Sequence, residues 1–137
     1  MGTANSTPKE GTILVVEDAD AIRKLVCSML SLNGYQCLEA SDGAEALQVV
    51  EKVNELHLVL TDVMMPHMGG PELARHLAIL RPEVRIIFMS GYTEDPMVRH
   101  VERLPGVFLP KPFTAAALTT KVRQALEQPW KGLPGVG

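Results

Sequence analysis

The sequence has no long apolar run, only two cysteines, few aromatic residues and no excess of positive charge. No run approaches the roughly 20 residues of a membrane-spanning helix, so we expect no insertion into a membrane. A net charge of −3 does not provide the strongly basic surface that binds phosphate backbones, which argues against a nucleic-acid partner. Residues 1–10 are polar and lack the apolar core of a secretory signal, so we expect a cytoplasmic protein.

The two cysteines, Cys27 and Cys37, each lie in a segment whose pattern is that of regular structure. A disulfide between them stays open on the sequence alone. Two reduced thiols, acting as small apolar side chains, fit a cytoplasmic protein better.

The chain is long enough for one packed domain and too short for two, because it has 137 residues, of which 46% are hydrophobic and 21% charged. We expect residues 1–10 to form a disordered leader, residues 11–127 the folded domain, and residues 128–137 a tail or linker.

Short apolar runs alternate with helical patterns along the chain. Residues 13–16, 58–60, 86–89 and 107–109 are almost continuously apolar, as in strands buried on both faces, and residues 35–39 suit an edge strand. Between the runs, apolar residues recur at the spacing of helices that bury one stripe, near 22–30, 46–50, 73–80, 97–101 and 118–126, so Ile22, Leu25 and Leu80 are expected to pack in the core. Five strand–helix units predict an α/β fold with a parallel sheet, right-handed crossovers and helices on both faces.

Charged and polar residues follow the predicted strands. Glu17 and Asp18 follow the first, Asp62 follows the third after Thr61, Ser90 follows the fourth, and Lys111 follows the fifth after Pro110. Ligands of open parallel sheets bind beyond the carboxyl ends of the strands, so these side chains are expected on one rim. Three carboxylates beside one ammonium leave two uncompensated negative charges, which favours Mg²⁺ and, beside a lysine, a phosphoryl group.

Each of these residues also fits a plainer role when it is taken alone. Glu17 or Asp18 could cap a helix, Asp62 could lie in a loop turn, and Lys111 could be a surface charge. Their joint placement at the ends of separate strands favours a shared site.

Four segments resemble the receiver domain of two-component signalling. They are Val-Val-Glu-Asp at 15–18, Asp-Val-Met-Met-Pro-His-Met-Gly-Gly at 62–70, Met-Ser-Gly at 89–91 and Lys-Pro-Phe at 111–113. The resemblance spans about residues 11 to 127. It implies a flavodoxin-like, doubly wound (βα)5 three-layer sandwich with strand order 2-1-3-4-5.

The resemblance assigns roles to the acidic residues. Asp62 corresponds to the phosphoacceptor, whose carboxylate takes a phosphoryl group from a phosphohistidine. Asp18 and Asp62 correspond to direct ligands of Mg²⁺, Glu17 to a residue that acts largely through water, and Met64 to a ligand through its backbone carbonyl. Glu17 stands where aspartate is commoner, and both residues occur in the family.

Four further residues match the family pattern. Lys111 is expected to pair with the phosphoryl oxygens, and the Ser90 hydroxyl to donate a hydrogen bond to them. Phe108 occupies the aromatic switch position, although ordinary core packing explains it equally well. The Lys111–Pro112 peptide bond is expected to be cis, so that the ammonium points into the site.

The resemblance also implies partners. The expected phosphodonor is a sensor histidine kinase or a histidine phosphotransfer protein, and a homodimer through the fourth helix, fifth strand and fifth helix is compatible with the pattern. As an isolated domain the chain would catalyse only its own phosphorylation and dephosphorylation. Residues 90–93 and 108–114 resemble receivers of hybrid sensor kinases, which slightly favours that origin over a stand-alone receiver.

Alternative functions are less well supported by the residues. A Mg²⁺-dependent phosphohydrolase of free substrates needs an acid–base carboxylate two residues after the nucleophile, where this chain has Met64. A nucleotide-binding module would carry a glycine-rich phosphate loop, which the sequence lacks. A degenerate receiver, acting only as a binding platform, would lack one or more of the acidic residues, Ser90 and Lys111, and this sequence has all of them.

Overall fold

The computed structural model describes residues 11–91, 99 and 107–132. The elements are β1 (Gly11–Val16), α1 (Asp20–Leu32), β2 (Tyr35–Ala40), α2 (Gly43–Lys52), β3 (Leu58–Asp62), α3 (Gly70–Leu80), β4 (Arg85–Ser90), β5 (Phe108–Pro110) and α5 (Ala115–Glu127). The predicted leader at 1–10 lies outside the described residues, as does the predicted helix at 97–101 apart from Arg99. None of the described helices is long and apolar enough to cross a membrane.

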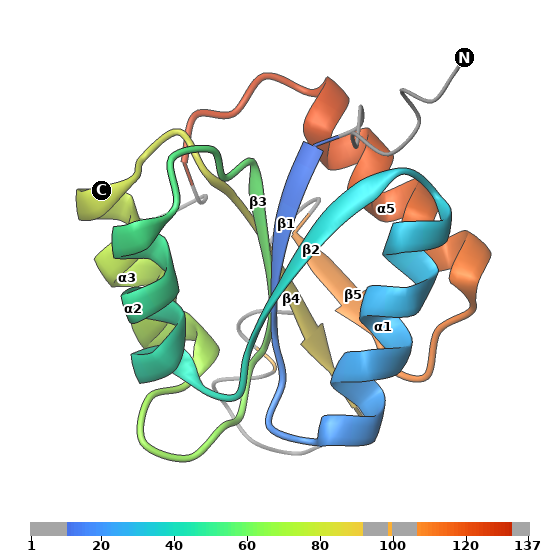
Figure 1. Ribbon diagram of the computed structural model, residues 1–137, viewed down its shortest axis with the longest axis horizontal. Coiled ribbons are helices and arrows are strands. Elements are labelled where there is room, and N and C mark those ends of the chain that lie inside the picture. Colours follow the sequence, from blue (N-terminus) through green and yellow to red (C-terminus); the bar gives the residue numbers. More distant parts are fainter. Residues whose placement is uncertain (1–10, 92–98, 100–106, 133–137) are drawn as a thin grey trace.

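The five strands form one parallel sheet in the order β2-β1-β3-β4-β5. Helices α1 and α5 cover one face of the sheet, and α2 and α3 cover the other (Figure 1). The predicted three-layer α/β fold and its strand order are therefore confirmed. After β1 the chain crosses to β2 at one edge of the sheet, and after β3 it crosses to β4 on the other side, so the strand order reverses between β1 and β3. Ligands of such sheets bind at this point.

Each face of the sheet has its own apolar core. Successive strand residues point to opposite faces, so Leu14 and Val16 join the core under α2 and α3, whereas Ile13 and Val15 join the core under α1 and α5. Both faces of the central strands are buried, which is why their sequences are continuously apolar rather than alternating.

The predicted apolar stripe of α1 is only partly buried. Val26 and Leu30 lie in the core, but Ile22 is 39% exposed and Leu25 is 56% exposed. At the end of α3, Leu80 is also exposed instead of buried. The expectation that these three residues pack in the core was wrong, because each lies at the margin of the helix face that meets the sheet.

Local signals place several helix ends. Gly34, with φ of +92°, follows the C-cap Asn33 of α1 in the left-handed conformation that glycine adopts readily. The Asp42 carboxylate caps α2 by accepting a hydrogen bond from the backbone N–H of Glu45 at 2.9 Å. Asp42 also contacts Nδ1 of His67 at 3.0 Å, so it connects α2 to the loop after β3.

Replacing this cap is expected to destabilise the protein. Asp42→Ala removes the acceptor for the Glu45 N–H and should lower the free energy of unfolding by about 1 kcal/mol. Asp42→Asn keeps a side-chain oxygen and should stay close to wild type. Urea denaturation of the three proteins measures the difference, and equal stability of Asp42→Ala and wild type would show that the cap contributes nothing.

The segment after α5 packs against the domain instead of leaving it. Trp130 is partly buried against the core under α2 and α3, and residues 128–132 cross the end of the sheet from one layer to the other (Figure 1). The Arg85 guanidinium donates to the carbonyls of Ala125 and Gln128 and so holds the end of α5 to β4. Residues 133–137 lie outside the described part of the chain.

Candidate functional site

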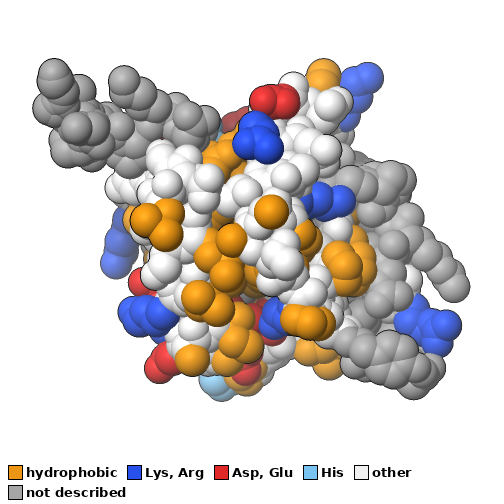
Figure 2. All heavy atoms as spheres, turned by 90° about the vertical axis from the view of Figure 1, so that its right-hand side faces the viewer, with side chains coloured by type: hydrophobic (Ala, Val, Ile, Leu, Met, Phe, Trp, Pro, Cys, Tyr) orange, Lys and Arg blue, Asp and Glu red, His pale blue; other side chains and the backbone are white. Residues whose placement is uncertain are grey.

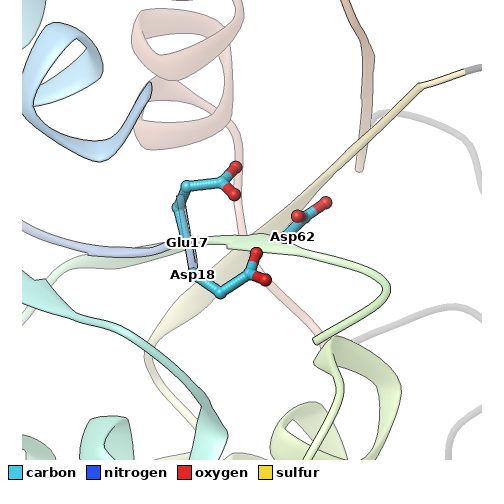
Figure 3. Close-up of side chains that lie close together, drawn as sticks. All are labelled: Glu17, Asp18 and Asp62. Atoms are coloured by element: carbon cyan, nitrogen blue, oxygen red, sulfur yellow. The ribbon is translucent and has the colours of Figure 1, made fainter. Parts of the chain in front are cut away.

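Three carboxylates meet at the carboxyl ends of β1 and β3. Val16 pairs with Thr61 in the sheet, so the residues that follow, Glu17 and Asp62, are neighbours. Carboxylate oxygens of Glu17, Asp18 and Asp62 all lie within 4.8 Å of one another (Figure 3). Hard divalent cations such as Mg²⁺ prefer oxygen ligands of this kind, so the donor set fits that ion.

Lys111 supplies the positive charge beside these carboxylates. Its Nζ lies 2.7 Å from Oε1 of Glu17 and 3.4 Å from Oδ2 of Asp62. The backbone N–H of Lys111 donates to the carbonyl of Ser90 at 2.8 Å, and the Lys111–Pro112 peptide bond is cis. The pKa of Lys111 is raised despite burial, because both carboxylates stabilise the ammonium.

Glu17 is a fully buried ionised side chain. Burial alone would raise the pKa of Glu17, but hydrogen bonds from Lys111 and from the backbone N–H of Ala19 hold it below its ordinary value. The Arg23 guanidinium donates to the Glu17 carbonyl at 2.8 Å and pairs with Glu39 of β2 at 2.9 Å. Arg23 therefore fixes the loop that carries the acidic pair.

Asp62 behaves differently from Glu17. Burial and the nearby negative charge of Glu17 raise the pKa of Asp62 to about 6, although Lys111 opposes this shift. Oδ1 of Asp62 accepts a hydrogen bond from the backbone N–H of Val63 at 3.1 Å, whereas Oδ2 faces Lys111. The ammonium of Lys111 does not fully compensate the cluster, so an additional cation would stabilise the ionised form of Asp62.

This shift predicts that the stability of the protein depends on pH. The folded protein binds the proton of Asp62 more tightly than the unfolded chain does. This tighter binding stabilises the fold fully below pH 3.8, and the stabilisation is lost as pH rises through about 6. Asp62→Asn replaces the carboxylate, which is only 14% exposed, by a neutral amide. It should therefore raise the free energy of unfolding at pH 7.5 by up to about 3 kcal/mol.

Urea denaturation in a chelator measures this effect, with Glu51→Gln on the exposed face of α2 as the control. The control should change stability by less than about 0.5 kcal/mol. An Asp62→Asn protein that is less stable than wild type at pH 7.5 would contradict a destabilising charge at residue 62.

Glycines allow the loop after β3 to return close to Asp62. The backbone N–H of Gly70 donates to the carbonyl of Val63 at 2.9 Å. A Cβ atom at Gly70 would collide with the carbonyl oxygen of Asp62 and would crowd the Phe88 ring. The start of α3 is thus held against the backbone of the phosphoacceptor candidate, which a side chain at residue 70 would prevent.

The remaining predicted residues lie around this cluster. Ser90 is buried next to the Asp62–Met89 pair of the sheet, and its hydroxyl donates to the carbonyl of Gly91 at 3.1 Å. Phe108 pairs with Phe88 in the sheet and packs, partly buried, against the core under α2 and α3. Met64 is exposed beside Val63.

An apolar groove adjoins the carboxylates. Its volume is about 500 Å³, and it is lined by Ile22, Leu25, Val26, Met29, Gly91, Lys111, Pro112 and Phe113. Hydrophobic side chains gather on this face of the molecule (Figure 2). Lys111 belongs to both the groove and the acidic cluster, so the two features form one continuous surface.

The sequence predicted the meeting of the acidic residues with Lys111, but it missed Arg23 and the groove. Arg23 reaches Glu39, which is 16 residues away on β2, and no local pattern indicates that contact. The groove arises from Ile22 and Leu25, which were assigned to the core.

Comparison with known families supports one class of protein. Residues 13–123 match the sequence profile described as the response regulator receiver domain. The chain is 42% identical over 119 residues to the sensor kinase CckA of Brucella abortus, and this alignment covers 85% of this chain but 13% of that kinase.

Two further relatives match over almost their whole length. The sporulation initiation phosphotransferase F of Bacillus subtilis is 31% identical over 83% of this chain and 92% of that protein. The crystal structure of the receiver domain of the hybrid histidine kinase CckA superposes with a TM-score of 0.68, at 34% identity, over 85% of this chain and all of that domain. The matched part of the larger relatives is therefore a single domain.

Proposed function

Because this chain belongs to the response regulator receiver domain family of two-component systems, we propose that Asp62 is its phosphoacceptor. The observation that carries the proposal is the position of Asp62, where one carboxylate is surrounded by Glu17, Asp18 and Lys111. Phosphoryl transfer requires mainly alignment and neutralisation of charge, and these neighbours can provide both.

The reaction uses the two oxygens of Asp62 differently. Val63 N–H holds Oδ1, so Oδ2 beside Lys111 is the oxygen that attacks phosphorus. An O–P bond forms while the N–P bond of the donor phosphohistidine breaks, and the imidazole leaves with its electron pair and takes up a proton. The product is an acyl phosphate on residue 62, whose oxygens Lys111 can bind.

Asp18, Asp62 and Glu17, with the backbone carbonyl of Met64, are the residues we propose to hold Mg²⁺. When it is bound, the ion neutralises negative charge on the phosphoryl oxygens. The raised pKa of Asp62 fits this role, because it reflects negative charge that Lys111 does not fully balance.

A small phosphodonor tests the proposal. Incubation with acetyl phosphate and Mg²⁺ should add one phosphoryl group per chain, detected by intact mass, and the group should be lost with hydroxylamine, which cleaves acyl phosphates. A chelator should prevent the addition. A hydroxylamine-resistant phosphate, or uptake that is unchanged in the chelator, would count against an Mg²⁺-dependent acyl phosphate.

The groove is the proposed docking surface for the protein phosphodonor, a sensor kinase or histidine phosphotransfer protein. Its apolar residues flank Lys111, so an apolar surface of the donor seated there would bring a phosphohistidine close to Asp62. We also propose a cytoplasmic location for the domain, because kinases obtain ATP in the cytoplasm.

Leu25→Glu tests the docking surface. A carboxylate that the docked donor would bury should slow phosphoryl transfer from a phosphohistidine protein about tenfold or more, whereas uptake from acetyl phosphate should be unchanged. Leu32→Glu, at an exposed position at the end of the same helix, is the matched control. Equal slowing by both variants, or slowing with acetyl phosphate, would argue against docking in the groove.

The proposed output uses Ser90 and Phe108. A phosphoryl group adds acceptor oxygens, towards which the Ser90 hydroxyl can turn from the Gly91 carbonyl. The resulting movement of the Ser90 loop would allow Phe108 to change its packing and so alter the surface of β5 and α5. We also propose a homodimer through this surface and the predicted fourth helix, of which only Arg99 belongs to the described residues.

The alternatives of a free-substrate phosphohydrolase and a binding platform have less support. The Met64 side chain offers no acid or base two residues after Asp62. A binding platform without phosphorylation does not require the acidic residues and Lys111 to meet at one point.

A further inference from the structure

The two cysteines of the chain face each other across α1 and β2. Cys27 is buried in α1, and Cys37 is partly exposed on β2. The Cys37 thiol donates a hydrogen bond to the carbonyl oxygen of Cys27, with Sγ 3.6 Å from that oxygen, so the two residues are in direct contact. Both side chains belong to the core under α1 and α5.

The spacing of the two elements keeps these thiols in register. Helix α1 runs opposite to β2, and Arg23 of the helix pairs with Glu39 of the strand. Four residues along a helix advance about 6 Å, and two residues along a strand advance about 6.6 Å. One such step from the Arg23–Glu39 pair therefore brings Cys27 opposite Cys37.

The two thiols have different reactivities. The pKa of Cys37 is lowered, mainly by its interaction with the neighbouring Cys27 thiol, although burial opposes this shift. The pKa of Cys27 is raised by this same interaction and by burial. Cys37 is also the more exposed of the two, so a small oxidant would reach the better nucleophile first.

We propose that Cys27 and Cys37 form a reversible intramolecular disulfide when the protein meets a hydroperoxide. The Cys37 thiolate attacks the peroxide, the O–O bond breaks, and an alcohol or water leaves as a sulfenic acid forms on Cys37. The Cys27 sulfur then attacks that sulfur, the S–O bond breaks, and water leaves with the Cys27 proton. Two thiols and one hydroperoxide thus give one disulfide, one alcohol or water from the peroxide, and one further water.

The bond would tie the helix that carries the docking groove to the edge strand of the sheet. Its formation should not depend on phosphorylation, because Cys27 and Cys37 lie within α1 and β2 at the core under α1 and α5, whereas Asp62 ends β3. The Asp62→Asn variant should therefore form the disulfide as wild type does, which separates failure of this proposal from failure of the proposed function.

Mass spectrometry of the native full chain tests the proposal. After hydrogen peroxide treatment, denaturation and alkylation with N-ethylmaleimide, the wild type should have lost two hydrogen atoms and should carry no maleimide. Dithiothreitol should restore two maleimide sites. Cys27→Ser should accumulate a sulfenic acid on Cys37 that dimedone traps, whereas the remaining thiol of Cys37→Ser should react at least about tenfold more slowly.

Three results would overturn the proposal. In the first, both wild-type thiols remain free at peroxide concentrations that oxidise the Cys37 thiol of Cys27→Ser. In the second, the only disulfides formed join separate chains, which gel filtration of the oxidised protein would reveal. In the third, the thiols of the two variants react equally fast, which would show that Cys37 is not the initial nucleophile.

Discussion

Asp62→Asn should abolish phosphoryl uptake from acetyl phosphate, with a loss of at least about 10²-fold in rate. The amide oxygen is a poor nucleophile, and among the described residues the only other carboxylate paired with Lys111 is that of Glu17. Glu17 is the nearest competitor, but its Oε1 is held by Lys111 and its Oε2 by the backbone N–H of Ala19. Intact mass measured over time in the presence of Mg²⁺ gives the rate.

Two features make this result interpretable. The variant is expected to be more stable than wild type, because it removes a destabilising charge, so a loss of uptake cannot be attributed to unfolding. Asp20→Asn changes an aspartate of the same rim that is 82% exposed, and it should take up phosphate as wild type does. Uptake by Asp62→Asn at more than a few per cent of the wild-type rate would place the acceptor elsewhere.

Lys111→Met should slow phosphoryl uptake by about 10²-fold. Methionine keeps most of the apolar stem that lines the groove but removes the ammonium that neutralises the incoming phosphoryl group. The pKa of Asp62 should rise above about 6 in this variant, because Lys111 is the group that lowers it. The rate with acetyl phosphate should accordingly fall most steeply at neutral and lower pH.

A matched variant distinguishes this effect from a general loss of positive charge. Lys24→Met removes a lysine that is 66% exposed and that pairs with Glu39 at 3.2 Å, and it should leave the rate within about twofold. Lys111→Arg keeps the charge and should retain part of the activity. Wild-type rates in Lys111→Met would show that the ammonium contributes nothing to the transfer.

Much of the fold could be predicted because burial on both faces of a parallel sheet produces continuous apolar runs. The runs at 13–16 and 58–60 lie inside β1 and β3, whereas β3 extends to Asp62. The sequence could not show this extension, because Thr61 and Asp62 are polar and are held in the strand by pairing with β1 and β4. Likewise, the exposure of Ile22 and Leu25 depends on how α1 sits on the sheet, which periodicity alone does not determine.

The site was predictable as a gathering of charges but not as a set of contacts. Strand ends placed Glu17, Asp18, Asp62 and Lys111 on one rim. The closest partner of Lys111, however, is Glu17 at 2.7 Å and not Asp62 at 3.4 Å. That preference depends on the depth to which each side chain is buried, and it makes Lys111 a counter-ion of the acidic pair before any phosphoryl group arrives.

The most direct test of the central claim is to identify the phosphorylated side chain. Borohydride reduces an acyl phosphate to an alcohol, so a phosphorylated aspartate becomes homoserine, which peptide mass spectrometry can locate. After treatment with acetyl phosphate and Mg²⁺ followed by borohydride, we predict homoserine at residue 62 and at no other position. Reduction at Asp18 or Glu17, or a phosphorylated peptide that borohydride leaves unchanged, would contradict the assignment of Asp62 as the phosphoacceptor.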